Sequence, residues 1–353
     1  MQLLKKTTAL LFMAFLFLAL LITMPFSGTA LAKKPVVFVS ILPQKYFVEQ
    51  IAGDTVDVEV MVMPGASPAT YEPRPRQMAK LATADVYLAI GVPFERTWLP
   101  RIQDTNPDLT IAHVDNILRK LPMAASAIDV DENPRGAILE DYRHESHEAH
   151  ETESTHEAHA THDMHEHHTH GHKHKDEQHV HKHSHVGMFD PHIWLSPRWV
   201  KAMAKPTRLA LSKIAPQHAK QYRINTRAFT KQLDDLDEEI DAIFNPIPPE
   251  KRAFMTFHPS WGYYAMTYNL IQIPIEFEGK APTPMVLEKI TEIAKKRNLR
   301  TIFVQPQFSQ SSAKAIADSI NGTIVVADPL AEDWEENLRT ISKKLAASFI
   351  LSE

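Results

Sequence analysis

The segment VVFVS at Val36–Ser40 is the first of several short β-branched runs that alternate with helical stretches. In the first part of the chain the expected strands and helices are Val36–Ser40, Tyr46–Ala52, Val58–Met61, Arg76–Ala84, Val86–Ala89 and, as a candidate fourth strand, Thr110–Ala112. Apolar strands that alternate with helices build parallel sheets covered on both faces. We therefore expect an α/β fold here. The alternation stops near Asp141.

The same alternation returns in the last part of the chain and predicts a second α/β half. Helical periodicity resumes at Pro197. The strands and helices expected beyond it are Phe254–Thr256, Ile271–Ile275, Met285–Arg297, Thr301–Val304, Ser311–Ile320, Thr323–Ala327 and Glu335–Phe349. The sequence thus predicts two lobes, each a small parallel sheet flanked by helices.

A long amphipathic helix is expected between the lobes and should join them rigidly. Its apolar residues recur at helical spacing and are Tyr222, Phe229, Leu233, Leu236, Ile240 and Ile243. Pro216 suits a first helical turn, and Pro246 follows the last one. At about 1.5 Å per residue such a helix extends about 43 Å. The lobes are assigned to residues 33–215 and 246–353, and the linker helix to residues 216–245.

The composition excludes several classes of protein. The chain has 353 residues, no cysteine, only 10 glycines and a formal net charge of −5. Without cysteine there is no disulfide, thiolate metal site, cysteine nucleophile or cysteine-linked lipid anchor. No glycine-rich phosphate-binding motif occurs, and the negative charge argues against nucleic acid as a partner. The unusual feature is the number of histidines, which is 20.

Residues 1–32 have the features of an export signal. Lys5 and Lys6 precede an apolar run at Ala9–Ile22, and Ala30–Ala32 offers small residues for cleavage. The alternative is an uncleaved membrane anchor, but the run is shorter than the roughly 20 residues that span a bilayer. We therefore expect cleavage near Ala32 and a periplasmic mature protein.

Residues 144–185 form a histidine-rich insertion in the first lobe. Because this segment has almost no apolar residues, we expect it to be disordered without a ligand. It is either a solvated polar tract or, as we favour, a mobile loop that captures metal, since imidazole binds zinc, copper and nickel. The auxiliary ligands expected in it are His165, His167, His168, His170, His172, His174, His179, His181, His183 and His185.

Outside the insertion, His192, His258 and Asp328 stand where an ordered metal site is expected. His192 lies in a turn stiffened by two prolines, and His258 and Asp328 directly follow expected strands. Parallel α/β sheets bind ligands beyond the carboxyl ends of their strands. The other two histidines, His113 and His218, are expected to be ordinary surface residues.

Several short motifs occur in a fixed order along the chain. They are Ser40-Ile41-Leu42-Pro43, Ile51-Ala52-Gly53-Asp54, Met63-Pro64-Gly65-Ala66-Ser67-Pro68, Tyr71-Glu72-Pro73, Asp190-Pro191-His192-Ile193-Trp194-Leu195, Thr256-Phe257-His258-Pro259, Glu278-Gly279-Lys280-Ala281-Pro282-Thr283-Pro284, Val304-Gln305-Pro306-Gln307-Phe308-Ser309 and Val326-Ala327-Asp328-Pro329-Leu330. With these motifs, nearly the whole mature chain resembles the zinc/manganese solute-binding proteins of bacterial ABC transporters. The resemblance implies two α/β lobes joined by a rigid helix, with a metal ion in the cleft between them.

The resemblance also implies that His192, His258 and Asp328 are the second, third and fourth metal ligands. The first ligand of the family is usually a histidine, in a stretch where this chain has Ala69. A methyl group cannot bind metal, so the fourth donor is open. A water molecule, a nearby carboxylate or carbonyl, or a histidine of the insertion could fill that place.

We therefore expect a monomeric periplasmic solute-binding protein that captures zinc and delivers it to an ABC permease of the inner membrane. Manganese is the alternative metal, disfavoured by the histidine-rich insertion. The alternative functions are a metal buffer, chaperone or adhesin without transport, and a metalloenzyme. An enzyme is disfavoured because the chain has no H-E-x-x-H motif, and no catalytic carboxylate is expected beside a ligand histidine.

Overall fold

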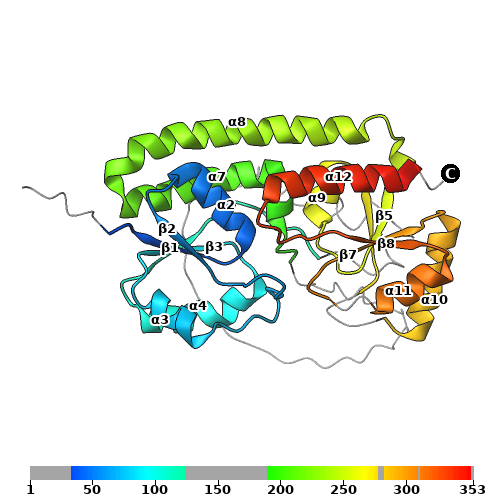
Figure 1. Cartoon of the computed structure of the whole chain (residues 1–353), viewed down its shortest axis with the longest axis horizontal. Helices are drawn as coiled ribbons and strands as arrows, with labels where there is room; N and C mark the ends of the chain where they lie inside the picture. The colour runs from blue at the N-terminus through cyan, green and yellow to red at the C-terminus, as the bar shows by residue number, and fades with distance from the viewer. Residues whose placement is uncertain (1–32, 124–188, 277–281, 309–310, 351–353) are drawn as a thin grey trace, which may run out of the picture. The chain divides into compact units, whose positions relative to one another are not determined.

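The computed structural model describes residues 33–123, 189–276, 282–308 and 311–350 (Figure 1). Met1–Lys34 and Pro35–Glu353 are two separate units. Only Lys33 and Lys34 of the first unit are described, so the fold below is that of the second unit. The expected export signal and the histidine-rich insertion lie outside the described residues. None of the described helices is both long and apolar enough to span a membrane.

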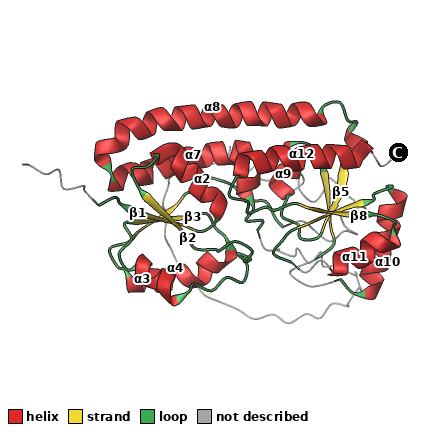
Figure 2. Ribbon diagram, viewed as in Figure 1, coloured by secondary structure: helices red, strands yellow, loops and turns green. Residues whose placement is uncertain are grey.

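The first half is a four-stranded parallel sheet with helices on both faces (Figure 2). Its elements are β1 (Val36–Val39), α2 (Leu42–Ala52), β2 (Asp57–Val60), α3 (Pro75–Leu81), β3 (Val86–Ala89), α4 (Pro93–Thr105) and β4 (Thr110–His113). The strand order is β2-β1-β3-β4. All residues of β3 are buried, which explains why this central strand is continuously apolar rather than alternating.

The second half repeats this arrangement. Its elements are β5 (Ala253–Thr256), α9 (Gly262–Thr267), β6 (Ile271–Pro274), α10 (Pro284–Lys296), β7 (Thr301–Val304), α11 (Ser311–Ser319), β8 (Thr323–Val326) and α12 (Trp334–Ile350). The strands are parallel in the order β6-β5-β7-β8, equivalent to that of the first sheet. The predicted α/β class with two small parallel sheets is confirmed.

Two helices, α4 and α9, are absent from the sequence-based prediction. Pro100 lies inside α4, and an internal proline is normally a sign against a helix. α9 has only six residues, too few to display a helical period. Both failures come from weak local signals, since tertiary packing supplies most of the stability of short helices.

The predicted long helix is present as α8 (Ala219–Phe244), which follows α7 (Pro197–Ile214). Figure 1 shows α8 running along both sheets, and it packs against α2, α7 and α12. One detail of the prediction is wrong, because Pro216–His218 form a separate 3₁₀ turn before the helix. Ile243 is partly buried and packs against the core, and Phe244, which the predicted apolar face did not include, is fully buried.

The hydrophobic core extends from the first half into the second. Tyr46 and Phe47 of α2, Phe229 of α8 and Trp334 of α12 form an aromatic cluster, with ring centroids between 5.1 and 6.2 Å apart. These rings come from both halves and from the connecting helix. Aromatic pairs stabilise beyond their buried area, so this cluster helps to hold the two sheets in a fixed relation.

Candidate metal site

His192 lies on a loop that is anchored to the second half. It immediately precedes a 3₁₀ turn at Ile193–Leu195 and is buried. Trp194 Nε1 donates a hydrogen bond of 2.7 Å to the carbonyl oxygen of Pro329, and Trp334 Nε1 donates one of 2.7 Å to the carbonyl oxygen of Trp194. These two hydrogen bonds fix the His192 loop to the segment that follows β8.

Asp190 orients the imidazole of His192. Its Oδ1 lies 2.7 Å from Nδ1 of His192 and also accepts a hydrogen bond of 2.9 Å from the backbone N–H of that residue. A Cβ on Gly262 would lie 2.4 Å from Oδ2 of Asp190, so the approach requires glycine at this position. Burial lowers the pKa of His192, against the opposing effect of Asp190. The neutral imidazole, which is the form that binds metals, is therefore favoured.

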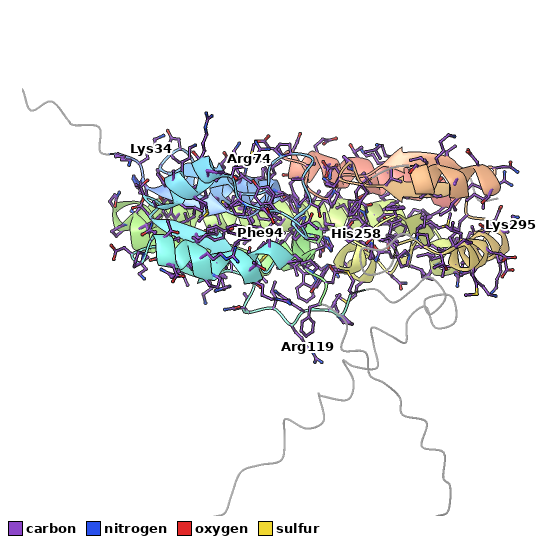
Figure 3. The ribbon with its side chains drawn as sticks, turned by 90° about the horizontal axis from the view of Figure 1, so that it is seen from below. Lys34, Arg74, Phe94, Arg119, His258 and Lys295 are labelled. Carbon is purple, nitrogen blue, oxygen red and sulfur yellow. The ribbon has the colours of Figure 1, made fainter. Side chains whose placement is uncertain are left out.

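His258 lies two residues after the end of β5 and is held by residues that follow β7. Its backbone N–H donates to Oε1 of Gln305 at 3.1 Å, and Gln305 Nε2 donates to its carbonyl oxygen at 2.8 Å. The imidazole stacks on Phe308, with ring centroids 4.9 Å apart. Figure 3 shows His258 at the end of the second half that faces the first.

The structure brings His192 and His258 together, although they lie 66 positions apart in the chain. Their ring centroids are 5.3 Å apart and the ring planes are inclined by 72°. Glu276, which follows β6, lies with both carboxylate oxygens 3.4 Å from Nδ1 of His258. Each imidazole thus has a buried carboxylate at its Nδ1 edge. The sequence did not predict these two carboxylates beside the histidines.

Asp328 lies at the same edge of the second sheet, but two strands away from His258. With neighbouring strands about 4.8 Å apart, the ends of β5 and β8 are roughly 10 Å apart. Oδ1 of Asp328 accepts hydrogen bonds from Gln307 Nε2 at 2.8 Å and from the backbone N–H of Leu330 at 2.9 Å. Asp328 also lines a cavity of about 210 Å³. The first half contributes to this cavity Ile41, Leu42, Val62, Met63, Pro64 and Gly65.

Within the described ranges, no group of three or more histidine, aspartate or glutamate side chains forms a candidate metal cage. The histidine pair is assembled, whereas Asp328 is hydrogen-bonded to its own neighbours. Ala69 is exposed in the loop after β2, and its backbone N–H donates to Ser67 Oγ at 3.2 Å.

The remaining candidates divide into two groups. His113 is the exposed last residue of β4, and His218 ends the 3₁₀ turn before α8, with its ring 5.9 Å from that of Tyr222. Neither residue takes part in the histidine pair. The ten auxiliary histidines proposed for the insertion lie outside the described residues.

The structure adds Asp190, Glu276 and Gln305 to the residues singled out from the sequence. Two of them could have been found by the rule that identified His258, since Glu276 and Gln305 follow the strands on either side of β5. Carboxyl ends of adjacent parallel strands meet at one edge of a sheet. Asp190 opens one of the motifs that carry the family resemblance, but nothing in the sequence assigned it a role beside His192.

Comparisons with known proteins bear on the family and the fold. Residues 37–348 match the family model for ZnuA, described as a periplasmic zinc-uptake complex component A. A putative metal-binding protein of Chlamydia muridarum is 26% identical over 320 residues, which cover 90% of this chain and 93% of that protein. The zinc-binding lipoprotein AdcA of Streptococcus pneumoniae is 26% identical over 300 residues, which cover 84% of this chain but only 50% of AdcA.

Solved structures of ZnuA are also similar. A crystal structure of ZnuA is 32% identical with a TM-score of 0.70, and the match covers 90% of this chain and all of that one. A deletion mutant of ZnuA with zinc bound gives the same identity and TM-score, and the match covers 98% of that chain.

Proposed function

Since the chain belongs to the ZnuA family of metal-binding solute-binding proteins, we propose that it captures zinc between its two halves and delivers it to an ABC permease of the inner membrane. The observation that carries the proposal is the assembled pair His192 and His258. The family to which the chain belongs consists of metal-binding proteins rather than enzymes, in agreement with the expectation from the sequence. Export to the periplasm, through the signal at residues 1–32, is part of the proposal.

The geometry of the histidine pair suits zinc. Two imidazoles that share one zinc ion at about 2.0–2.1 Å, with a tetrahedral angle at the metal, have ring centroids about 5.2 Å apart. The centroids of His192 and His258 are 5.3 Å apart. The observed separation of the two rings therefore supports a shared zinc ion. Both segments are held by hydrogen bonds to other parts of the fold, which keeps the pair in place before binding.

Asp328 is proposed as a third ligand that joins when zinc arrives. Its carboxylate is hydrogen-bonded to Gln307 and to the Leu330 backbone, and these bonds would have to rearrange. Zinc fits two imidazoles and one or two oxygen donors in a tetrahedral site, whereas manganese prefers more oxygen ligands. The two imidazole nitrogen ligands that the pair offers therefore support zinc over manganese.

The proposal is tested by competition titration with a chromophoric zinc chelator. The full-length protein, His258→Ala, Asp328→Ala and the exposed control His113→Ala are compared. We expect His258→Ala to weaken zinc binding at the tightest site by about a hundredfold or more, Asp328→Ala to weaken it less, and His113→Ala to have no effect. Unchanged affinity in His258→Ala, or a preference for manganese in the unaltered protein, would overturn the proposal.

A further inference from the structure

Glu276 is a buried carboxylate whose hydrogen bonding is incomplete. Its side chain is 3% exposed, and both oxygens lie 3.4 Å from Nδ1 of His258. Within the described parts of the chain, no donor forms a hydrogen bond with its Oε2. A buried carboxylate oxygen without a donor is costly. A proton on Nδ1 of His258 is the donor that this position favours.

Asp190 and His192 show the same arrangement on the other side of the pair. The side chain of Asp190 is 1% exposed and that of His192 is 10% exposed, while Glu276 and His258 are 3% and 18% exposed. In each case the carboxylate lies deeper than its imidazole and faces Nδ1. The opposite nitrogen, Nε2, is therefore the one left for a ligand that enters from the cleft.

Three contacts fix different parts of the His258 conformation. Gln305 is hydrogen-bonded to both the backbone N–H and the carbonyl oxygen of His258. Stacking on Phe308 fixes the plane of the imidazole ring. Neither contact distinguishes the ring from one turned over by a half-turn, which exchanges the positions of Nδ1 and Cδ2. Only a polar group at the ring edge makes that distinction, and Glu276 lies at that edge.

We propose that Glu276 is a positioning residue for zinc capture. Its carboxylate accepts the Nδ1 proton of His258, selects that tautomer and leaves Nε2 unprotonated and turned to the cleft. Histidine ligands of metals usually donate their other N–H to a carboxylate or carbonyl, which fixes the ring and raises its basicity. This role deepens the proposed function and rests on it.

The competing possibility is that Glu276 is itself a zinc ligand. Nitrogen and oxygen ligands of one tetrahedral zinc ion are about 3.3 Å apart, close to the observed 3.4 Å. That arrangement would place the metal at Nδ1, on the buried side of His258 that faces Glu276. The order of burial in both carboxylate–imidazole pairs therefore favours positioning over ligation.

The first experiment reads the tautomer without any metal. Long-range ¹H–¹⁵N spectra of the metal-free, full-length protein are recorded at about pH 8, and His258 is assigned by its loss in His258→Asn. We expect the Nδ1–H tautomer in the unaltered protein and a shift toward the Nε2–H form in Glu276→Ala. The exposed-site variant Glu250→Ala should leave the His258 signals unchanged. An unaltered tautomer in Glu276→Ala would overturn the positioning role.

The second experiment measures zinc binding in the same variants. We expect Glu276→Ala to lose about ten- to a hundredfold in zinc affinity, and Glu276→Gln to recover part of the loss because its amide oxygen still accepts the Nδ1 proton. Circular dichroism and thermal unfolding show whether each variant is folded. Equal affinity in Glu276→Ala and the unaltered protein would contradict the proposal.

Visible spectra of the Co²⁺-loaded proteins separate positioning from direct ligation. A positioning residue leaves the ligand set of the bound metal intact, so Glu276→Ala should keep the tetrahedral band pattern at saturating Co²⁺. Loss of that pattern would identify Glu276 as a ligand and overturn the proposal. If the unaltered protein bound neither metal, the proposed function would fail while the tautomer experiment remained readable.

Discussion

Ala69 places a methyl group where the family resemblance implies a histidine ligand. It is exposed in the loop after β2, and the same loop reaches the cavity that Asp328 lines, through Met63, Pro64 and Gly65. Ala69→His should supply a third imidazole and raise zinc affinity by about tenfold or more. The matched control is Thr70→His, which adds the same group one residue further along. Equal gains in both variants, or none in Ala69→His, would contradict the prediction.

Glu95 predicts a pH dependence of stability that is separate from metal binding. It is buried near the amino end of α4, where it accepts hydrogen bonds from Ser40 Oγ and from the backbone N–H groups of Ile90 and Gly91. Burial raises the pKa of Glu95 from 4.5 to about 7. The folded state therefore holds this proton more tightly than the unfolded state does. The contribution of Glu95 to the free energy of unfolding is complete below about pH 4.5 and is lost as the pH rises through about 7.

Glu95→Gln should remove this part of the pH dependence, because the amide stays neutral. Measured by urea unfolding, the variant should gain stability relative to the unaltered protein between about pH 5 and about pH 8, by up to about 3 kcal/mol. Asp54→Asn, at an exposed aspartate, is the control and should show no such trend. A constant difference between Glu95→Gln and the unaltered protein across this range would show that Glu95 stays ionised.

At the level of single elements, the sequence predicts strands better than it predicts contacts between them. β5 and β8 are marked by β-branched and aromatic runs, so His258 and Asp328 could be assigned to strand ends. The order β6-β5-β7-β8 is a tertiary property, and it decides that Glu276 and Gln305, not Asp328, are the neighbours of His258. Without that order, Asp328 could not be separated from the histidine pair.

The helix α8 predicts how strongly the halves depend on each other. Leu236 is 1% exposed on the face of α8 that enters the common core. Leu236→Ala should destabilise the protein by about 2–5 kcal/mol through lost burial and a residual cavity. Because α8 packs against helices of both halves, we expect one cooperative transition at a lower urea concentration.

The measurement combines urea unfolding followed by tryptophan fluorescence with far-ultraviolet circular dichroism. Glu238→Ala, at an exposed position of the same helix, is the control and should change stability by less than about 0.5 kcal/mol. Two separated transitions in Leu236→Ala would mean that the halves fold independently, against the role assigned to α8.

For the whole molecule, the sequence predicts the two sheets and the helix along them but leaves the cleft incomplete. The histidine pair forms because the His192 loop is carried to the second half by the contacts of Trp194 with Pro329 and of Trp334 with Trp194. Those contacts join residues 135 and 140 positions apart. No local pattern encodes such pairs, whereas periodicity and strand composition are local and can be read directly.

The ends of the segment that contains the histidine-rich insertion are joined in the folded unit. Pro122 and Phe189 form an isolated antiparallel bridge, and the backbone N–H of Asp190 donates to the carbonyl oxygen of Leu121 at 2.8 Å. Tyr263 strengthens this junction, since the backbone N–H of Leu121 donates to its hydroxyl at 2.9 Å. We therefore expect that residues between these ends can be removed without separating the segments that carry the histidine pair.

Deletion of residues 144–185 should thus leave the unfolding temperature and the tightest zinc affinity unchanged, while lowering the number of zinc ions bound at saturation. Thermal unfolding measures the first quantity, and isothermal titration calorimetry with metal analysis of the saturated protein measures the other two. His258→Ala provides the converse case of a retained insertion with a damaged histidine pair. If the deletion also weakened the tightest site, a histidine of the insertion would have to occupy the place left open at Ala69. Ala69→His should then restore the affinity of the deleted protein, because a fixed imidazole would replace one supplied by a long tether.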